Sequence, residues 1–457
     1  MSVLQSINPA TGAVIAQYQP STSIEIDKAL SAAQKSFESW RKTNFKERSK
    51  VLKAVATQIR KDINMLAELA TKEMGKPIEQ SIAELSKCAR TFDFYAKEGA
   101  AMLANEVVET DASKSYISYQ PLGTVLAVMP WNFPYWQVFR CAAPILMAGN
   151  TMVLKHASNV SGCALAIEEV FTKAKAPKGL FQTLLLPAEQ VAETIARPEI
   201  CAVTFTGSTV AGSKVAEAAG RAIKKQVLEL GGSDAYVILE DADLDLAIKT
   251  CVDSRLNNSG QSCVSAKRFI VVKSVRKEFE NRMKVAMEAA LWGDDPMDRT
   301  MKIGPLARLD LRDTLHEQVE ASVAKGAKIL CGGKKPEGDG AFYPPTILTN
   351  VKKGMPAYDE ELFGPVAAII EAKDETDAMK KANDSIFGLG GAIFSRDKKR
   401  AEILAATEFQ AGSCFVNAAV HSDPRMPFGG VKKSGYGREL GSYGIREFTN
   451  VKTVFVR

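Results

Sequence analysis

The sequence predicts an α/β fold built on parallel sheet, because short apolar runs alternate with segments of helical periodicity. Most runs are followed by a loop or a helix-start signal, as a doubly wound sheet requires. The runs lie at residues 124–130, 151–155, 182–187, 202–207 and 226–232, and again at 235–239, 268–272, 367–370, 391–394 and 413–417. The second group indicates a second α/β domain that starts near residue 230.

Two helical stretches precede these runs. Thr22 and Glu25 form a capping-box pattern, and apolar residues then recur at helical spacing as far as Trp40, which indicates a helix with one face in the core. A second stretch is predicted from about residue 46 to residue 74, ending near Gly75.

Two further segments alternate with period two, at residues 115–121 and 449–457. They fit either ordinary edge strands or a two-stranded arm that extends the sheet of another subunit. The residues alone leave both readings open.

The composition excludes several classes of protein. Its 59 basic and 53 acidic residues are interleaved, so no nucleic-acid partner is indicated. The first residues form no signal peptide, and we find no apolar run of about 18 residues, so we expect a cytoplasmic protein without membrane contact. Eight widely spaced cysteines and three histidines suggest no metal site.

One cysteine stands out. Cys263 follows Gly-Gln-Ser, and its small and polar neighbours indicate a tight turn that exposes the side chain. A nucleophilic cysteine needs a base or an electropositive site, yet the sequence contains no recognisable Cys/His arrangement. Taken alone, such a cysteine is more often a structural residue than a nucleophile.

Three other motifs carry possible chemistry. Glu229 ends an apolar run, and a carboxylate in apolar surroundings has a raised pKa that suits a general base. Asn132 lies in the stiff loop PWNFP and could donate to an oxyanion. Residues 205–212 form a strand, a glycine turn and a helix start, which could bind phosphate. Each motif could instead be a structural turn or connector.

Together the motifs INPATG, PWNFP, LKHAS, FTGSTVAG, LELGG, SGQSC, EELFGP and PFGGVKKSGYGRE resemble the aldehyde dehydrogenase superfamily, from Asn8 to the C-terminus. The resemblance implies a Rossmann-type cofactor domain at 1–114 and 122–229 and an α/β catalytic domain at 230–420. It also implies a small β oligomerisation arm at 115–121 and 445–457, in a homodimer or homotetramer.

The resemblance also implies a mechanism. Cys263 attacks an aldehyde to give a thiohemiacetal, with Asn132 and the Cys263 backbone N–H stabilising the oxyanion. Loss of hydride to a nicotinamide leaves a thioester, and Glu229 activates the water that hydrolyses it. Cys263 then needs no histidine, because a bound cationic nicotinamide and backbone dipoles favour its thiolate.

Cofactor binding is implied for a set of residues that face different parts of NADP or NAD. They are Lys155 and Ser158 at the adenosine ribose, Trp131 and Ser208 at the phosphates, Glu361 and Phe363 at the nicotinamide, and Phe205 and Gly207 in the same motif. Many relatives carry glutamate at the place of Ser158. A serine there can donate to a 2′-phosphate that glutamate would repel, so we expect NADP to be accepted.

For the substrate, the sequence most resembles the succinate-semialdehyde dehydrogenase branch. Arg140 stands eight residues after Asn132 on the expected helix, where it could bind a substrate carboxylate, with Ser422 as a neutral second contact. Arg140 could instead form an intramolecular salt bridge. Contacts from His421, Arg425 and Tyr135 stay open.

Three other functions remain alternatives to oxidation of succinate semialdehyde. The first is a broader aliphatic or aromatic aldehyde dehydrogenase, in which Arg140 is not a substrate ligand. The second is a thioester hydrolase or acyltransferase that uses Cys263. The third is a non-catalytic binding protein, which the joint presence of Cys263, Glu229 and Asn132 disfavours.

Overall fold

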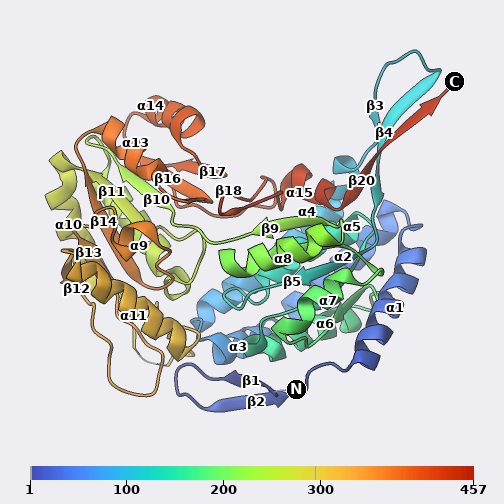
Figure 1. Cartoon of the computed structure of the whole chain (residues 1–457), viewed down its shortest axis with the longest axis horizontal. Helices are drawn as coiled ribbons and strands as arrows, with labels where there is room; N and C mark the ends of the chain where they lie inside the picture. Colours follow the sequence, from blue (N-terminus) through green and yellow to red (C-terminus); the bar gives the residue numbers. More distant parts are fainter. Residues whose placement is uncertain (1–2, 294) are drawn as a thin grey trace.

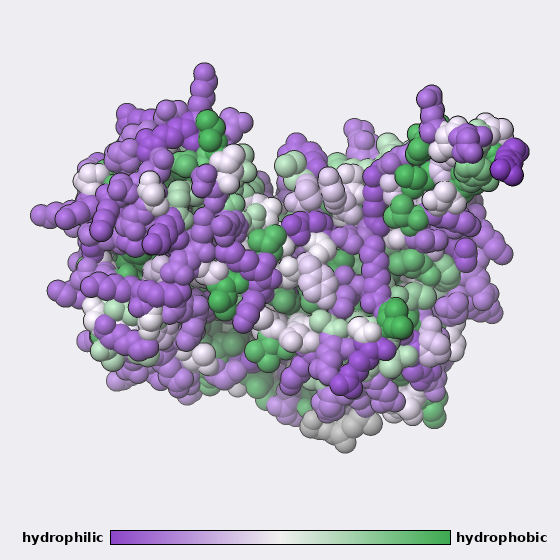
Figure 2. Space-filling model, turned by 45° about the horizontal axis from the view of Figure 1, so that its top comes forward, coloured by the Kyte–Doolittle hydropathy of each residue, from purple (hydrophilic) through white to green (hydrophobic). Residues whose placement is uncertain are grey.

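A computed structural model describes residues 3–293 and 295–457, and residues 1, 2 and 294 lie outside this description. Two lobes stand side by side, and an arm that carries the C-terminus projects from one of them (Figure 1). A hollow separates the lobes on the face shown in Figure 2.

The first lobe contains a six-stranded sheet in the order β19-β9-β8-β5-β6-β7. Strands β5 to β9 are parallel, and β19 joins β9 in antiparallel fashion. Its strands are β5 (Thr124–Val128), β6 (Thr151–Lys155), β7 (Phe181–Thr183), β8 (Ile200–Thr206), β9 (Lys225–Glu229) and β19 (Gly435–Tyr436).

Helices cover this sheet, and a hairpin of β1 (Leu4–Ile7) and β2 (Val14–Tyr18) lies below it (Figure 1). The helices are α1 (Ser23–Trp40), α2 (Phe45–Lys61), α3 (Ile63–Met74), α4 (Ile78–Met102), α5 (Trp136–Met147), η1 (Ser158–Val160), α6 (Ser161–Lys173), η2 (Ala188–Gln190), α7 (Val191–Ala196), α8 (Thr209–Arg221) and α15 (Gly441–Glu447).

The second lobe contains a seven-stranded sheet in the order β12-β13-β14-β11-β10-β16-β17, parallel except for the β12–β13 pair. The strands are β10 (Ala235–Ile238), β11 (Arg268–Val272), β12 (Lys328–Cys331), β13 (Thr346–Thr349), β14 (Val366–Ala372), β16 (Gly390–Phe394) and β17 (Ser413–Val416). A small sheet pairs β15 (Phe387–Gly388) with β18 (Val431–Lys432). The helices are α9 (Leu244–Leu256), η3 (Asn257–Gly260), α10 (Lys273–Glu288), α11 (Leu309–Ala324), α12 (Pro356–Asp359), α13 (Glu375–Asn383), α14 (Lys398–Ile403) and η4 (Leu404–Glu408).

The arm is a three-stranded sheet of β20 (Thr449–Val456), β4 (Lys114–Pro121) and β3 (Glu106–Val107). The alternation in the sequence indicated β4 and β20 but not the short β3. Hydrophobic side chains gather on this arm, at the upper right of Figure 2, and Val451 and Phe455 are 58% and 49% exposed. Such a row on an edge is typical of a surface that another chain covers.

The predicted α/β class with parallel sheet is confirmed, and so is the capping box of Thr22 and Glu25 at the start of α1. The prediction of one helix from residue 46 to 74 is wrong, because α2 and α3 are separated at Asp62. Asp62 leaves the helical region, with φ −96° and ψ 11°, and its carboxylate accepts from Gln58 Nε2 at 2.8 Å. Among the described residues, no helix is both long enough and apolar enough to cross a membrane.

Candidate active site

Cys263 follows a strained turn. The two residues Asn258 and Ser259 in η3 have φ values of 52° and 54°, which non-glycine residues rarely adopt. Asn258 Nδ2 donates to the carbonyl of Asn132 at 2.6 Å, and Ser259 Oγ donates to the carbonyl of Gly304 at 2.9 Å. The turn is therefore tied to the PWNFP loop and leaves Cys263 half-buried.

Lys267 stabilises this turn through hydrogen bonds. Its Nζ donates to the carbonyls of Ser262 at 2.9 Å and Cys263 at 2.8 Å, and it lies 3.4 Å from a carboxylate oxygen of Glu361. Lys267 was not among the site residues predicted from the sequence. A lysine shortly before the apolar run at residues 269–272 was the available signal, because such a cation needs buried acceptors.

Two cavities share Cys263. The α4 cavity, of about 240 Å³, includes Cys263, Lys87, Arg140, Ser422 and Phe428 in its wall. The β8 cavity, of about 390 Å³, is lined by Cys263 together with Trp131, Asn132, Gly207, Ser208, Glu361, Phe363 and others. The thiol is thus accessible to two different molecules.

The thiol is protonated in the free protein at neutral pH. Burial raises the pKa of Cys263 to about 12, although the charges of Arg140 and Lys267 lower it. Nucleophilic chemistry therefore requires additional positive charge or a base near Sγ.

The β8 cavity suits a dinucleotide. Trp131 and Phe363 meet edge to face, with ring centroids 5.8 Å apart. Ser208 caps the 13-residue helix α8, and a helix start of this kind favours phosphate. A Cβ at Gly231 would come within 2.5 Å of Glu361 Oε2, so the Glu361 carboxylate lies directly against this part of the wall. These features fit a flat ring at one end and a phosphate at the other.

Asn132 has an amide that is only partly used. Its Nδ2 donates to the carbonyl of Gln261 at 3.0 Å, whereas its buried Oδ1 has no partner among the described residues. The second Nδ2 hydrogen can face an oxyanion formed next to Cys263.

Three expected cofactor contacts lie outside the β8 cavity. Lys155 ends β6 and Ser158 begins η1, where Ser158 is exposed. Strand β5 pairs in parallel with both β6 and β8, so the carboxyl ends of these strands lie at the same edge of the sheet. Lys155 and Ser158 therefore lie at the edge where the β8 cavity also opens. Phe205 is 4% exposed and packs beneath Gly207, so its ring is part of the core and not of the cavity wall.

Glu229 lies at the end of β9 and is 2% exposed. Neither carboxylate oxygen has a hydrogen-bond partner among the described residues. Burial raises its pKa well above the usual carboxyl range, nearby Glu439 raises it further, and Arg140 opposes this. Glu229 lines neither cavity, but the next two residues, Leu230 and Gly231, line the β8 cavity.

Arg140 forms the intramolecular ion pair that the sequence left as an alternative. Its Nε contacts Glu439, and its Nη2 donates to Thr206 Oγ1 at 3.3 Å. The guanidinium also lies over the ring of Phe428, 4.8 Å from its centroid. Although Arg140 lines the α4 cavity, its charge is already neutralised by protein.

Lys87 was likewise not among the predicted site residues. It lies on α4 in the same wall, and its Nζ donates to Ser422 Oγ at 2.8 Å. Burial lowers the pKa of the Lys87 ammonium to about 8, and neighbouring Arg140 lowers it too. The spacing from Glu84 by one helical turn was the available signal, because it places Lys87 near the face of α4 that contacts α5.

The sequence left open whether His421, Tyr135 and Arg425 contact the substrate, and only His421 lines the α4 cavity. Tyr135 is buried and donates to the carbonyl of Leu66 at 2.9 Å, outside that cavity. Arg425 is exposed and pairs with Asp423 at 2.6 Å.

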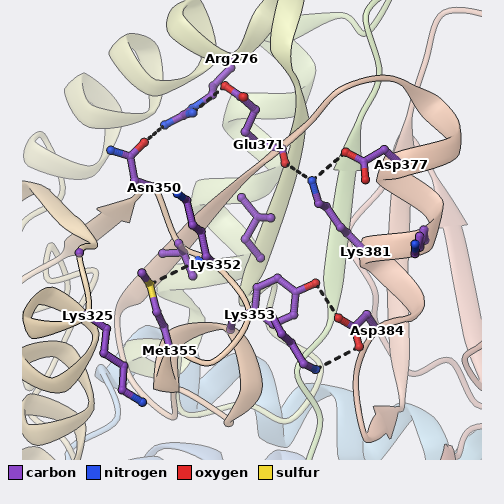
Figure 3. Close-up of a pocket in the computed structure, with 15 residues that line it drawn as sticks. Arg276, Lys325, Asn350, Lys352, Lys353, Met355, Glu371, Asp377, Lys381 and Asp384 are labelled. Atoms are coloured by element: carbon purple, nitrogen blue, oxygen red, sulfur yellow. Dashed lines mark hydrogen bonds and ion pairs between the residues drawn. The ribbon is translucent and has the colours of Figure 1, made fainter.

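A larger cavity, of about 710 Å³, lies in the second lobe (Figure 3). Several of its cations are already paired, as for Lys353 with Asp384 at 3.0 Å and Lys381 with Asp377 at 2.7 Å. Cys263 is absent from its wall. Its pairing pattern therefore does not indicate an anion site, and the two cavities at Cys263 are the better candidates.

Two α/β lobes with a cysteine between two cavities define a dehydrogenase-like architecture, and the chain belongs to the aldehyde dehydrogenase family, which it matches over residues 2–454. The resemblance inferred from the motifs is confirmed. A probable succinate-semialdehyde dehydrogenase (NADP(+)) from Synechocystis sp. is 49% identical over 453 residues, covering 99% of each chain. A succinate semialdehyde dehydrogenase (NAD(P)+) from Escherichia coli is 48% identical over 98% of this chain and 97% of the relative.

Solved structures of aldehyde-oxidising enzymes have the same fold as this chain. Succinic semialdehyde dehydrogenase from Streptococcus pyogenes, solved in complex with NADP+, has a TM-score of 0.97 and 38% identity over 99% of both chains. A lactaldehyde dehydrogenase structure has a TM-score of 0.96 and 31% identity, covering 100% of this chain and 96% of the other.

Proposed function

We propose that the protein oxidises succinate semialdehyde to succinate with NADP or NAD. The observation that carries this proposal is the position of Cys263, whose side chain borders both cavities. The β8 cavity offers aromatic rings and a helix start to a dinucleotide, while cations lie in the wall of the α4 cavity. The relatives from Synechocystis sp. and Escherichia coli support the choice of substrate and cofactor.

The first step forms a bond to sulfur. Cys263 gives its proton to solvent water, and the Sγ thiolate adds to the aldehyde carbon. The resulting oxyanion takes a proton from solvent and becomes the hydroxyl of a thiohemiacetal. The Asn132 amide and the Cys263 backbone N–H stabilise the negative oxygen. When a nicotinamide is bound, it supplies the acceptor for the hydride whose loss, with the hydroxyl proton, leaves a thioester on Cys263.

The second step breaks the bond to sulfur. Glu229 takes a proton from water, the water oxygen attacks the thioester carbon, and Cys263 leaves as the thiolate, which takes the proton back from Glu229 to become the thiol of the next cycle. This role requires the Glu229 side chain to turn from its buried position toward Cys263. Leu230 and Gly231, the next two residues of the chain, already line the β8 cavity.

For the cofactor, we assign the nicotinamide end to Glu361 and Phe363, the phosphates to Trp131 and Ser208, and the adenosine ribose to Lys155 and Ser158. Exposed Ser158 leaves room for a 2′-phosphate, and Lys155 adds positive charge. We therefore assign NADP as an accepted cofactor.

A broader aldehyde dehydrogenase is the second candidate. The observation that favours it is the Arg140–Glu439 ion pair, since a neutralised arginine does not by itself select an acid. The similarity to a lactaldehyde dehydrogenase is compatible with this alternative.

Turnover of the purified protein tests both candidates. Reduced cofactor is followed with succinate semialdehyde and with butanal, using NADP and NAD in parallel, and Cys263→Ala is the control. We expect activity that requires the thiol and a kcat/KM at least about tenfold higher for the acid, as one charged contact provides. Equal kcat/KM values would support the broader enzyme, and turnover without nicotinamide would instead indicate a hydrolase or acyltransferase.

The remaining assignments concern assembly and location. We assign cofactor binding to residues 1–114 and 122–229, catalysis to 230–420, and oligomerisation to 115–121 and 445–457. The exposed apolar side chains of the arm support a homodimer or homotetramer, which light scattering would test. A cytoplasmic location follows the sequence expectation, which cell fractionation would test.

A further inference from the structure

Lys87 is a cation whose charge the surrounding protein leaves unbalanced. Within the part of the chain that the structure describes, its ammonium contacts Ser422 Oγ and the indole ring of Trp136, with Nζ 4.0 Å from the ring centroid. Among the described residues, no carboxylate oxygen lies within the 4.0 Å of an ion pair with it. A half-buried ammonium without a carboxylate partner is costly, unless a ligand supplies the negative charge.

The nearest carboxylates have other partners. Glu84 pairs with buried Lys76 and accepts from the backbone N–H groups of Tyr135 and Trp136 at 2.9 and 2.7 Å. Asp423, the other acid that acts on Lys87, pairs with Arg425. Both carboxylates favour the charged form of Lys87, but neither forms an ion pair with it.

The other cation of the α4 cavity wall differs in this respect. Arg140 pairs with Glu439 and also donates to Thr206. The unmatched positive charge in this wall therefore belongs to Lys87 and not to Arg140, although both residues share the cavity with Cys263.

We infer that Lys87, oriented by Ser422 and Trp136, binds the carboxylate of the substrate and sets the preference for an aldehyde that carries an acid. This inference rests on the proposed function. With the aldehyde carbon at Cys263, the acid group lies at Lys87 in the same cavity. Ser422 accepts from Lys87, so its hydroxyl hydrogen remains free to donate to the same carboxylate. The Lys87 ammonium supplies the positive charge, and the Ser422 hydroxyl orients the substrate carboxylate by a directed hydrogen bond.

The experiment compares charge and neutral variants at position 87. Lys87→Met keeps the apolar stem and removes the charge, Lys87→Arg restores the charge, and Lys97→Met serves as control, because Lys97 lies on the same helix and is 81% exposed. For each variant, kcat and KM are measured with succinate semialdehyde and with butanal.

We expect Lys87→Met to reduce the ratio of kcat/KM for the acid to kcat/KM for butanal by about 10- to 100-fold, mainly through KM. Lys87→Arg should recover part of this ratio, and Lys97→Met should keep it. Turnover of butanal by Lys87→Met reports that the variant is folded; if it fails to fold, Lys87→Gln takes its place.

A binding measurement gives a second readout. Titration of succinate into Cys263→Ala protein should show about 10-fold weaker binding or more when Lys87→Met is added. If the wild type prefers the acid and Lys87→Met retains both this preference and succinate affinity, the inference is overturned while the proposed function stands. If the wild type shows no preference for the acid, the proposed function fails first.

Discussion

Arg140 and Glu439 form a buried ion pair that connects α5 with the segment just before α15, and their side chains are 2% and 3% exposed. Glu439 also accepts from Thr204 Oγ1 at 3.4 Å. The pair lies beside Glu229, whose pKa both residues influence in opposite directions. The ion pair therefore couples the stability of the first lobe to the protonation state of Glu229, the proposed base.

Removal of one partner should destabilise the protein more than removal of both. We expect Arg140→Met to cost about 3–5 kcal/mol, because it leaves Glu439 buried without its cation. The double variant Arg140→Met, Glu439→Leu should recover a large part of that loss. Midpoints of denaturant unfolding measure both effects, and equal midpoints for the single and double variants would contradict this account.

Substitution of Glu229 should separate the two chemical steps. In Glu229→Gln the thioester still forms but is hydrolysed slowly, so we expect a burst of about one reduced cofactor per active site, followed by slow turnover. Rapid mixing with succinate semialdehyde measures the burst. Loss of the burst together with turnover would place Glu229 before thioester formation.

The same variant should be more stable at alkaline pH. The pKa of Glu229 is higher in the folded protein than in the unfolded chain. The unfolded state therefore binds fewer protons above the ordinary carboxyl range, and the free energy of unfolding falls as pH rises. Glu229→Gln removes this effect and should raise Tm at pH 8 by roughly a few degrees, with little change near pH 4. The matched control is Glu317→Gln at an exposed glutamate, whose Tm should follow the wild type at both pH values.

The raised pKa of Cys263 predicts slow alkylation of the free protein. Since that pKa is about 12, the thiolate fraction should rise about tenfold per pH unit between pH 7 and pH 10. Mass spectrometry of the Cys263 peptide after timed exposure to iodoacetamide gives the rate, with the Cys201 peptide as an internal reference. A plateau at neutral pH would mean that the free thiol is already ionised.

Position 158 should control the choice between cofactors. We expect Ser158→Glu to raise KM for NADP by about 10- to 100-fold, because the carboxylate repels the 2′-phosphate, while KM for NAD changes little. Ser158→Ala should have a smaller effect in the same direction. An equal change for both cofactors would place the 2′-phosphate elsewhere.

Local patterns in the sequence identified most of the fold, and long-range contacts account for what they missed. The apolar runs predicted β6 and β11 to the residue, whereas the continuous helical periodicity concealed the break at Asp62. Motifs located Cys263 and Asn132, which the structure brings to one cavity.

Two side-chain pairings in the wall of the α4 cavity join residues that lie far apart in the chain. Lys87 resembles a solvent-facing helical lysine until Ser422 is placed beside it. Arg140 resembles a free cation until Glu439 is placed beside it. Neither pairing could be predicted from local sequence periodicity, because the partners are hundreds of residues apart in the chain.

The second lobe is a continuous insertion between two neighbouring strands, since β9 precedes it and β19 follows it, with Gly435 opposite Glu229. During synthesis, the strand that ends in Glu229 gains this edge partner only after the whole second lobe has left the ribosome. We therefore expect the inserted lobe to fold while the first sheet is still open, and a nascent chain that stops before β19 to lack the mature environment of its proposed base.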